Sequence, residues 1–173
     1  MIEFNLDKYL PKIVWQAQGA QKYLCKVRKI LLNVTPEETR RQAFLTYLIE
    51  EQKVPEQQLL VEVPLPNQQN KIDILVLDAT NAPLIIYEWY NEAEKAATSA
   101  ISTAIKYYET LHTIDYVGVV KGNQIDLVSF VHNREEVFVV KYTQHPTYSN
   151  LCKGNANPFI QTQPLRDFLH PLH

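Results

Sequence analysis

Two carboxylates, Asp73 and Glu88, occupy positions from which they could bind a divalent cation. Asp73 lies near the start of one short apolar run, Ile72–Asp78, and Glu88 lies near the end of another, Pro83–Trp89. Both runs are rich in β-favouring residues, and the turn residues between them predict a hairpin. Antiparallel pairing would bring the two carboxylates to the same end of that hairpin. Mg²⁺ prefers oxygen ligands and keeps several waters, so the two side chains, the Trp89 carbonyl and a substrate phosphate would suffice to hold it. Such an ion can activate water for hydrolysis.

A third carboxylate, Glu38, has two candidate roles. It lies in T-P-E-E, where Thr35 can cap a helix, Pro36 fits the first helical position, and Glu38 occupies the acidic position of a capping box. This helix is expected to run to about Gln52. Glu38 therefore stabilises the helix start, assists the hairpin carboxylates at a metal ion, or does both. For the hairpin carboxylates the structural alternative is a pair of solvated strand ends.

The rest of the chain alternates between helical and strand patterns. A long helix is expected from Asn91 to about His112, because small and apolar residues recur along one face. Three β-rich runs separated by turns follow it: D-Y-V-G-V-V, Q-I-D-L-V-S-F and E-V-F-V-V-K-Y. This order predicts an α/β fold with a mixed central β-sheet flanked by helices.

The whole chain, residues 1–173, is expected to form a single domain. Its 173 residues suit one core, and 46% of them are hydrophobic. The core is expected over residues 27–141, with residues 1–26 and 142–173 as peripheral extensions. Near the C-terminus, P-L-R-D-F-L predicts a short helix that begins at Pro164. No apolar run is long enough for a signal peptide or a transmembrane helix, so a cytoplasmic protein without membrane contact is expected.

Composition argues against several kinds of site. Cys25 and Cys152 are far apart and fit no zinc spacing, so reduced structural thiols are expected. The five histidines are scattered, and the four glycines form no phosphate loop or dinucleotide fingerprint. The net charge of −2 argues against tight DNA binding. The most basic region is residues 22–29 together with Arg40 and Arg41; it is either an ordinary charged surface or a nucleic-acid contact.

Four segments occur in a particular order and spacing: T-P-E-E-T-R-R-Q from Thr35, I-D-I-L-V from Ile72, P-L-I-I-Y-E from Pro83, and K-Y-Y-E-T-L followed by K-G-N. Together they resemble the N-terminal nuclease-like domain of type I restriction enzyme R subunits and its stand-alone relatives, within the PD-(D/E)XK superfamily. The resemblance covers about residues 27 to 128 and implies a restriction-endonuclease-like fold. It also implies that Asp73 and Glu88 hold Mg²⁺, and that a lysine two residues after Glu88 helps to position the attacking water.

The position of that lysine is occupied by Tyr90. A tyrosine with its usual pKa of about 10 is neutral at physiological pH, so it lacks the charge that would stabilise a hydroxide or the transition state. The family also tends to carry a glutamine one turn before a tyrosine of the long helix. Here the corresponding residue before Tyr107 is Thr103. Two functional positions therefore depart from the family pattern.

A relocated lysine could replace the missing charge. Lys95 is the first candidate, because it lies early on the expected long helix, from which a flexible side chain could reach the carboxylates. A solvated charge on the helix surface is the structural alternative for Lys95. Lys71 and Lys106 are further options.

The sequence supports two functions. The first is a nucleic-acid-associated protein with a degenerate or noncanonical phosphodiesterase centre that uses Mg²⁺ or Mn²⁺, with DNA as the expected partner and RNA still open. The second is a catalytically inactive interaction or scaffold module, in which Tyr87, Trp89 and Tyr90 contact a protein partner or a second copy of the chain.

Overall fold

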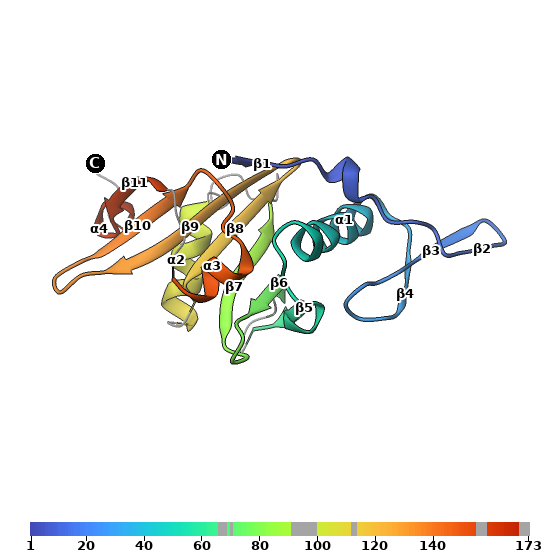
Figure 1. Ribbon diagram of the computed structural model, residues 1–173, viewed down its shortest axis with the longest axis horizontal. Coiled ribbons are helices and arrows are strands. Elements are labelled where there is room, and N and C mark those ends of the chain that lie inside the picture. The colour runs from blue at the N-terminus through green and yellow to red at the C-terminus, as the bar shows by residue number, and fades with distance from the viewer. Residues whose placement is uncertain (66–68, 70, 91–99, 112–113, 155–158, 170–173) are drawn as a thin grey trace.

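A mixed β-sheet forms the centre of the molecule (Figure 1). The structure is a computed structural model that describes residues 1–65, 69, 71–90, 100–111, 114–154 and 159–169. Its strands are β1 (Ile2–Glu3), β2 (Trp15–Ala17), β3 (Ala20–Leu24), β4 (Leu31–Asn33), β5 (Leu59–Pro64), β6 (Lys71–Leu77), β7 (Pro83–Trp89), β8 (Tyr116–Lys121), β9 (Gln124–His132), β10 (Val137–Tyr142) and β11 (Phe159–Pro164). Its helices are α1 (Pro36–Glu50), α2 (Ala100–Leu111), α3 (Tyr148–Cys152) and α4 (Arg166–Leu169), with short 3-10 helices η1 (Leu6–Tyr9) and η2 (Glu56–Gln58).

The central sheet contains eight strands. Seven of them follow the order β11-β10-β9-β8-β7-β6-β5, and β1 pairs with β9. The β7–β8 pair is parallel, whereas the other described pairs of this sheet are antiparallel. A parallel pair needs a long crossover connection, and α2 lies within the one that joins β7 to β8. The predicted α/β fold, with a mixed central sheet flanked by helices, is confirmed.

The two long helices pack on opposite faces of the sheet. On one face, the ring of Phe44 in α1 lies 5.0 Å from the Tyr87 ring and 5.4 Å from the Trp89 ring. On the other face, Tyr107 of α2 contacts Glu88, which lies between those two aromatics in β7. Because successive strand residues point to opposite faces, β7 presents aromatic residues to α1 and a carboxylate to α2.

The expected elements near the carboxylates form close to their predicted positions. The Thr35 side chain caps α1 by accepting a 3.0 Å hydrogen bond from the backbone N–H of Glu38, and α1 ends at Glu50, slightly before the predicted end. β6 and β7 form the predicted antiparallel hairpin. The predicted first residue of the C-terminal helix, Pro164, is wrong. Pro164 is the last residue of β11, and α4 begins at Arg166.

Both predicted extensions contribute strands to the central sheet. β1 pairs with β9, and β11 pairs with β10. Residues 15–33 instead form a separate antiparallel sheet in the order β2-β3-β4, which projects away from the central sheet next to α1 (Figure 1). Within the described residues, no helix has the length and apolarity needed to cross a membrane.

A buried polar network lies beside α1. His145 Nδ1 donates to the Pro146 carbonyl at 2.7 Å, so in the neutral imidazole Nε2 accepts from the Tyr87 hydroxyl. Nearby, the Gln52 side-chain amide donates to the Tyr47 hydroxyl at 2.8 Å. Burial lowers the pKa of His145 to about 4, with the bond to Pro146 opposing the shift.

This network predicts a loss of stability in mild acid. The pKa of His145 is depressed on folding, so between about pH 6.5 and pH 4 the unfolded chain binds the proton more readily, and its contribution to stability falls with pH. Relative to His145→Gln, the wild type should lose about 2 kcal/mol between pH 7 and pH 5. Urea unfolding of both proteins at the two pH values measures this difference. Equal pH dependence in the two proteins would contradict the prediction.

Candidate active site

Asp73 and Glu88 face each other across two neighbouring strands. The register of the hairpin pairs Ile74 with Tyr87, so the next step along the strands sets Asp73 opposite Glu88. The two side chains are hydrogen-bonded to each other. The sequence prediction that the hairpin brings these carboxylates together therefore agrees with their placement.

Backbone and helix groups hold each carboxylate in place. The backbone N–H of Trp89 donates to Asp73 Oδ2 at 2.9 Å. The hydroxyl of Tyr107, on α2, donates to Glu88 Oε1. Because the chain crosses over from β7 to β8, it places this tyrosine above the carboxylate face of the sheet. Tyr107 is thus the helix residue that orients the pair.

Glu88 keeps a proton at neutral pH. Burial, together with the hydrogen bond and the negative charge of Asp73, raises the pKa of Glu88 to about 8. The Tyr107 hydroxyl and the positive charge of Lys106 oppose this increase. Two ionised carboxylates side by side in a half-buried site would repel each other, and the proton on Glu88 removes one of the two charges.

The same chemistry fits a divalent cation. Two adjacent carboxylates that need a positive charge between them are the oxygen ligands that Mg²⁺ and Mn²⁺ prefer. Among the described residues, no group of three or more His, Cys, Asp and Glu side chains is placed to hold a metal ion. Two carboxylates are nevertheless sufficient for Mg²⁺, which usually keeps several waters and binds substrate phosphates.

Glu38 is occupied by structural contacts. Its carboxylate accepts a 2.6 Å bond from Arg41 Nη1 and a 2.8 Å bond from the Gln42 side-chain amide. It is buried on α1, which packs on the face of the sheet opposite to the Glu88 side chain. These contacts give Glu38 a role in α1 and no described link to Asp73 or Glu88.

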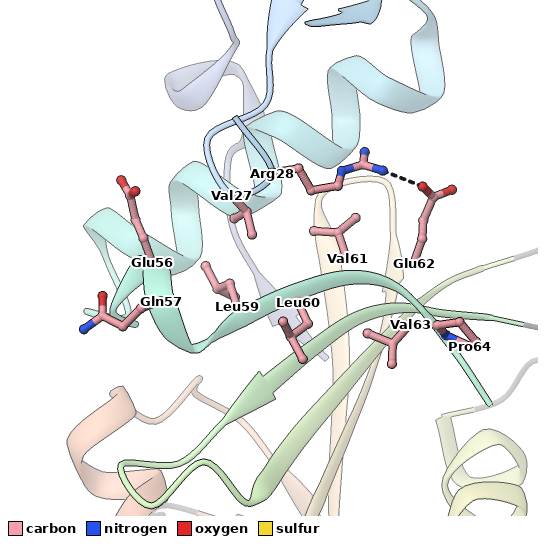
Figure 2. A pocket seen from close by; sticks show the side chains of 10 residues that line it. All are labelled: Val27, Arg28, Glu56, Gln57, Leu59, Leu60, Val61, Glu62, Val63 and Pro64. Carbon is pink, nitrogen blue, oxygen red and sulfur yellow. Dashed lines mark hydrogen bonds and ion pairs between the residues drawn. The ribbon is translucent and has the colours of Figure 1, made fainter. Parts of the chain in front are cut away.

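A fourth acidic residue, Glu62, is also directed away from the pair. In β5 it lies between Val61 and Val63, which pair with residues on either side of Asp73, but its φ of 54° departs from strand geometry. Figure 2 shows its carboxylate paired with Arg28, at 2.6 Å, beside a groove of about 510 Å³ along β5. The break in regular strand conformation thus leaves the carboxylate pair without a third member.

The two arginines predicted to contact nucleic acid have different environments. The Arg41 side chain is 6% exposed and forms ion pairs with Glu37 at 3.0 Å and with Glu38 at 2.6 Å. It is therefore part of the protein interior and is not available to a phosphate. Arg40, the preceding residue, is exposed and lines a pocket together with Tyr90.

Tyr90 occupies the position of the missing lysine and is packed rather than free. Its ring joins the apolar cluster under α2, and its backbone N–H donates to the Val120 carbonyl at 2.9 Å. The ammonium of Lys121, at the end of β8, lies 4.4 Å from the centre of the Tyr90 ring. A cation is therefore next to the position from which the motif lysine is absent.

The lysines proposed from the sequence are placed unequally. Lys95 lies outside the described residues. Lys106, on the exposed side of α2, is close enough to Glu88 for its charge to lower the pKa of that carboxyl. Lys71 is exposed at the start of β6. Sequence reasoning did not identify Lys121, because its proximity to Tyr90 depends on the parallel β7–β8 register, which pairs Trp89 with Val120.

The aromatic residues of β7 do not form an exposed contact surface. Tyr87 is 1% exposed, and Trp89 packs against the α1 side of the core. Tyr87 is therefore unavailable for the predicted protein contact, whereas Trp89 and Tyr90 are partly buried and line a pocket, so the interaction module stays a prediction.

A comparison with known proteins gives one family. Over residues 36–145, the chain matches the family model of the type I restriction enzyme R protein N terminus (HSDR_N). The matched range runs from the start of α1 through β10, so it contains the hairpin carboxylates, Tyr107 and Lys121. No curated protein matches the chain.

Proposed function

As the chain belongs to the family of type I restriction enzyme R protein N-terminal domains, we propose that it is a nucleic-acid-associated nuclease domain whose metal-dependent centre is noncanonical. The observation that carries this proposal is the pairing of Asp73 with Glu88 on adjacent strands, beneath a tyrosine that is bonded to Glu88.

Asp73 and Glu88 would hold Mg²⁺ or Mn²⁺ in this centre. When bound, such an ion supplies Lewis acidity and a water of lowered pKa for attack on a phosphodiester. Asp73 keeps its orientation through the Trp89 N–H, and Glu88 keeps its orientation through the Tyr107 hydroxyl. Displacement of the proton from Glu88 leaves that carboxylate charged, as a metal ligand must be.

We assign the auxiliary positive charge to Lys106. Among the lysines proposed from the sequence, it is the one whose charge acts on Glu88 within the described part of the chain. A lysine on the exposed side of α2 retains a flexible stem, so it can approach a phosphate without a change in the sheet. Lys95 and a charge donated by a partner protein remain alternatives.

Charge distribution supports a polyanionic partner. Residues 8–34 contain six of the chain's 17 Lys and Arg residues and none of its 19 Asp and Glu residues. This segment includes the projecting sheet β2-β3-β4 and the exposed Trp15. Exposed aromatic and basic side chains together suit nucleic acid, so DNA is the proposed ligand and RNA is an alternative to be tested. We place this activity in the cytoplasm, where the free thiols Cys25 and Cys152 would stay reduced.

A protein partner or a second copy of the chain is the other candidate ligand. It is favoured by exposed apolar side chains gathered in the same N-terminal region: Leu10, Ile13, Val14, Leu24, Ile30 and Leu31. Light scattering of the purified protein over a range of concentrations would detect self-association. In that case the N-terminal sheet would be a protein interface.

Metal binding and cleavage test the proposed function together. Calorimetric titration should show Mn²⁺ binding to the wild type, at least tenfold weaker binding to Asp73→Ala, and unchanged binding to Glu38→Gln. Glu38→Gln is the matched control, because that carboxylate belongs to the α1 ion-pair network. Supercoiled plasmid, single-stranded DNA and RNA should then be incubated with Mg²⁺ or Mn²⁺. Unchanged Mn²⁺ affinity in Asp73→Ala, or absence of cleavage of every substrate, would rule out the proposed centre as a nuclease.

A further inference from the structure

A pocket of about 320 Å³ lies at the ends of β7 and β8, where the strands that carry the candidate site terminate. Tyr90, which lines it, follows Glu88 by two residues, so the two side chains project from the same face of the chain. Arg40 enters the lining from α1, and Lys121 enters from β8. The pocket is therefore next to the carboxylate pair but uses none of its groups.

The lining carries two cations without acidic partners. Within the described residues, no carboxylate oxygen lies within 4.0 Å of the Arg40 guanidinium or the Lys121 ammonium. Arg41 provides the contrast, because the neighbouring arginine is buried and bound to glutamates. Lys121 is held over the Tyr90 ring, a contact that leaves its hydrogen-bond donors free for an anion.

An unused neutral donor accompanies these charges. Trp89 also lines the pocket, and its indole N–H is buried without a hydrogen-bond partner in the described structure. A buried donor without an acceptor is costly, and nearly all such groups in folded proteins have partners. The Trp89 ring lines the pocket although its N–H is closed to solvent, so a ligand with acceptor oxygens would bind the two exposed cations beside this ring.

We propose that this pocket is a phosphate-binding subsite that takes a backbone phosphate of nucleic acid beside the Asp73–Glu88 pair. The inference rests on the proposed function for the identity of the ligand. A phosphate offers a negative charge and several acceptor oxygens. Arg40 can bind it through two parallel guanidinium N–H groups, and Lys121 can bind it through its ammonium. In this arrangement Arg40 and Lys121 fix the position of the substrate strand, and the carboxylate pair acts on a neighbouring phosphodiester.

Nuclear magnetic resonance can test the pocket directly. The chain contains two tryptophans, so the spectrum of ¹⁵N-labelled protein has two indole N–H signals, which Trp15→Phe assigns. Titration with inorganic phosphate should shift the Trp89 signal and not the Trp15 signal, and titration with a thymidine dinucleotide that carries a 5′-phosphate should also shift the Trp89 signal. Chloride at the same ionic strength should have no effect.

Charge variants supply the matched comparison. Arg40→Gln/Lys121→Gln should weaken dinucleotide binding at least tenfold, whereas Arg134→Gln/Lys153→Gln, which removes two exposed charges elsewhere, should leave it unchanged. Lys121→Arg should retain affinity, because the charge remains. The proposal is overturned if the Trp89 signal does not move in the wild type, or if it moves equally at the same concentrations in Arg40→Gln/Lys121→Gln.

The two proposals fail separately. Asp73→Ala should abolish cleavage and weaken Mn²⁺ binding at least tenfold, but its Trp89 signal should still shift when phosphate is added. A Trp89 shift without cleavage of any substrate would overturn the nuclease and support the subsite. Cleavage that is unaffected in Arg40→Gln/Lys121→Gln, with no Trp89 shift, would overturn the subsite and support the nuclease.

Discussion

Glu88→Gln is expected to make the protein more stable at pH 8 and to reduce metal-dependent cleavage at least 100-fold. The pKa of Glu88 rises from 4.5 to about 8 on folding. Between these values the unfolded chain loses its proton while the folded chain keeps it, so stability falls as the pH rises. The difference between the two pKa values sets an upper limit of about 5 kcal/mol on the free-energy cost of ionised Glu88 in the folded protein. Because a half-buried carboxylate keeps part of its hydration, we expect a cost of about 2 kcal/mol.

Glutamine is neutral at position 88 without the extra proton that Glu88 needs. Its carbonyl oxygen can still accept from Tyr107, and its amide can donate to Asp73, so both contacts of Glu88 persist. Cleavage should nevertheless fall at least 100-fold, because a neutral amide is a poor ligand for Mg²⁺ and electrostatic contributions of single groups are of this size.

Urea unfolding of wild type and Glu88→Gln at pH 5 and pH 8 measures the stability change. The gain should be several times larger at pH 8. Glu109→Gln, which neutralises an exposed carboxylate on the same helix as Tyr107, is the control and should change neither stability nor cleavage. In addition, Mn²⁺ should raise the melting temperature of the wild type at pH 8 and leave that of Glu88→Gln unchanged. If Glu88→Gln were less stable than the wild type at pH 8, the negative charge of Glu88 would not destabilise the fold.

Tyr90→Lys is expected to raise the cleavage rate about 100-fold, because one well-placed charge at a phosphoryl transition state has an effect of this order. The new ammonium would lie at the position that the family pattern assigns to lysine. It would also come close to Lys121, whose ammonium is 4.4 Å from the Tyr90 ring centre. Repulsion between the two cations could lower stability and conceal the gain in rate.

A reciprocal exchange avoids that repulsion. Tyr90→Lys/Lys121→Tyr keeps the total charge and reverses the cation–ring pair, so it should show the rate increase with little change in melting temperature. Tyr90→Gln removes the ring without adding a charge and is the control for packing. Rates should be measured on the substrate that the wild type cleaves best. If neither lysine variant exceeds the rate of Tyr90→Gln, position 90 does not limit the chemistry.

The fold around the carboxylates could be predicted because its signals are local. Thr35 and Pro36 define the start of α1, and the apolar runs on either side of residues 79–82 define the β6–β7 hairpin. The exact register was not predictable in this way, because it shifts by one residue between Val76 and Leu77, and this shift sets Asp73 opposite Glu88. Prediction of the hairpin alone was nevertheless enough to bring the two carboxylates of the candidate site close together.

The remainder depends on contacts between distant segments. The N-terminal residues show no strand pattern, yet Ile2 pairs with Ile125. Likewise, nothing local in the sequence shows that Arg41 is buried against glutamates while Arg40 is exposed, since a helix presents adjacent residues to different directions only once its packing partner is known. Such positions depend on tertiary packing, which a single sequence encodes only weakly.

The N-terminal segment also determines when the pocket can exist. The Asn123 carbonyl accepts from the Phe4 N–H at 3.0 Å, its side chain accepts from the Leu6 N–H at 3.3 Å, and Leu6 lines the pocket. These contacts join Phe4 and Leu6 to a turn that lies more than a hundred residues later in the chain. Contacts of such long sequence separation are slow to form. We therefore expect the pocket to form after the local β6–β7 hairpin, so that the carboxylates are paired before the proposed phosphate site is complete.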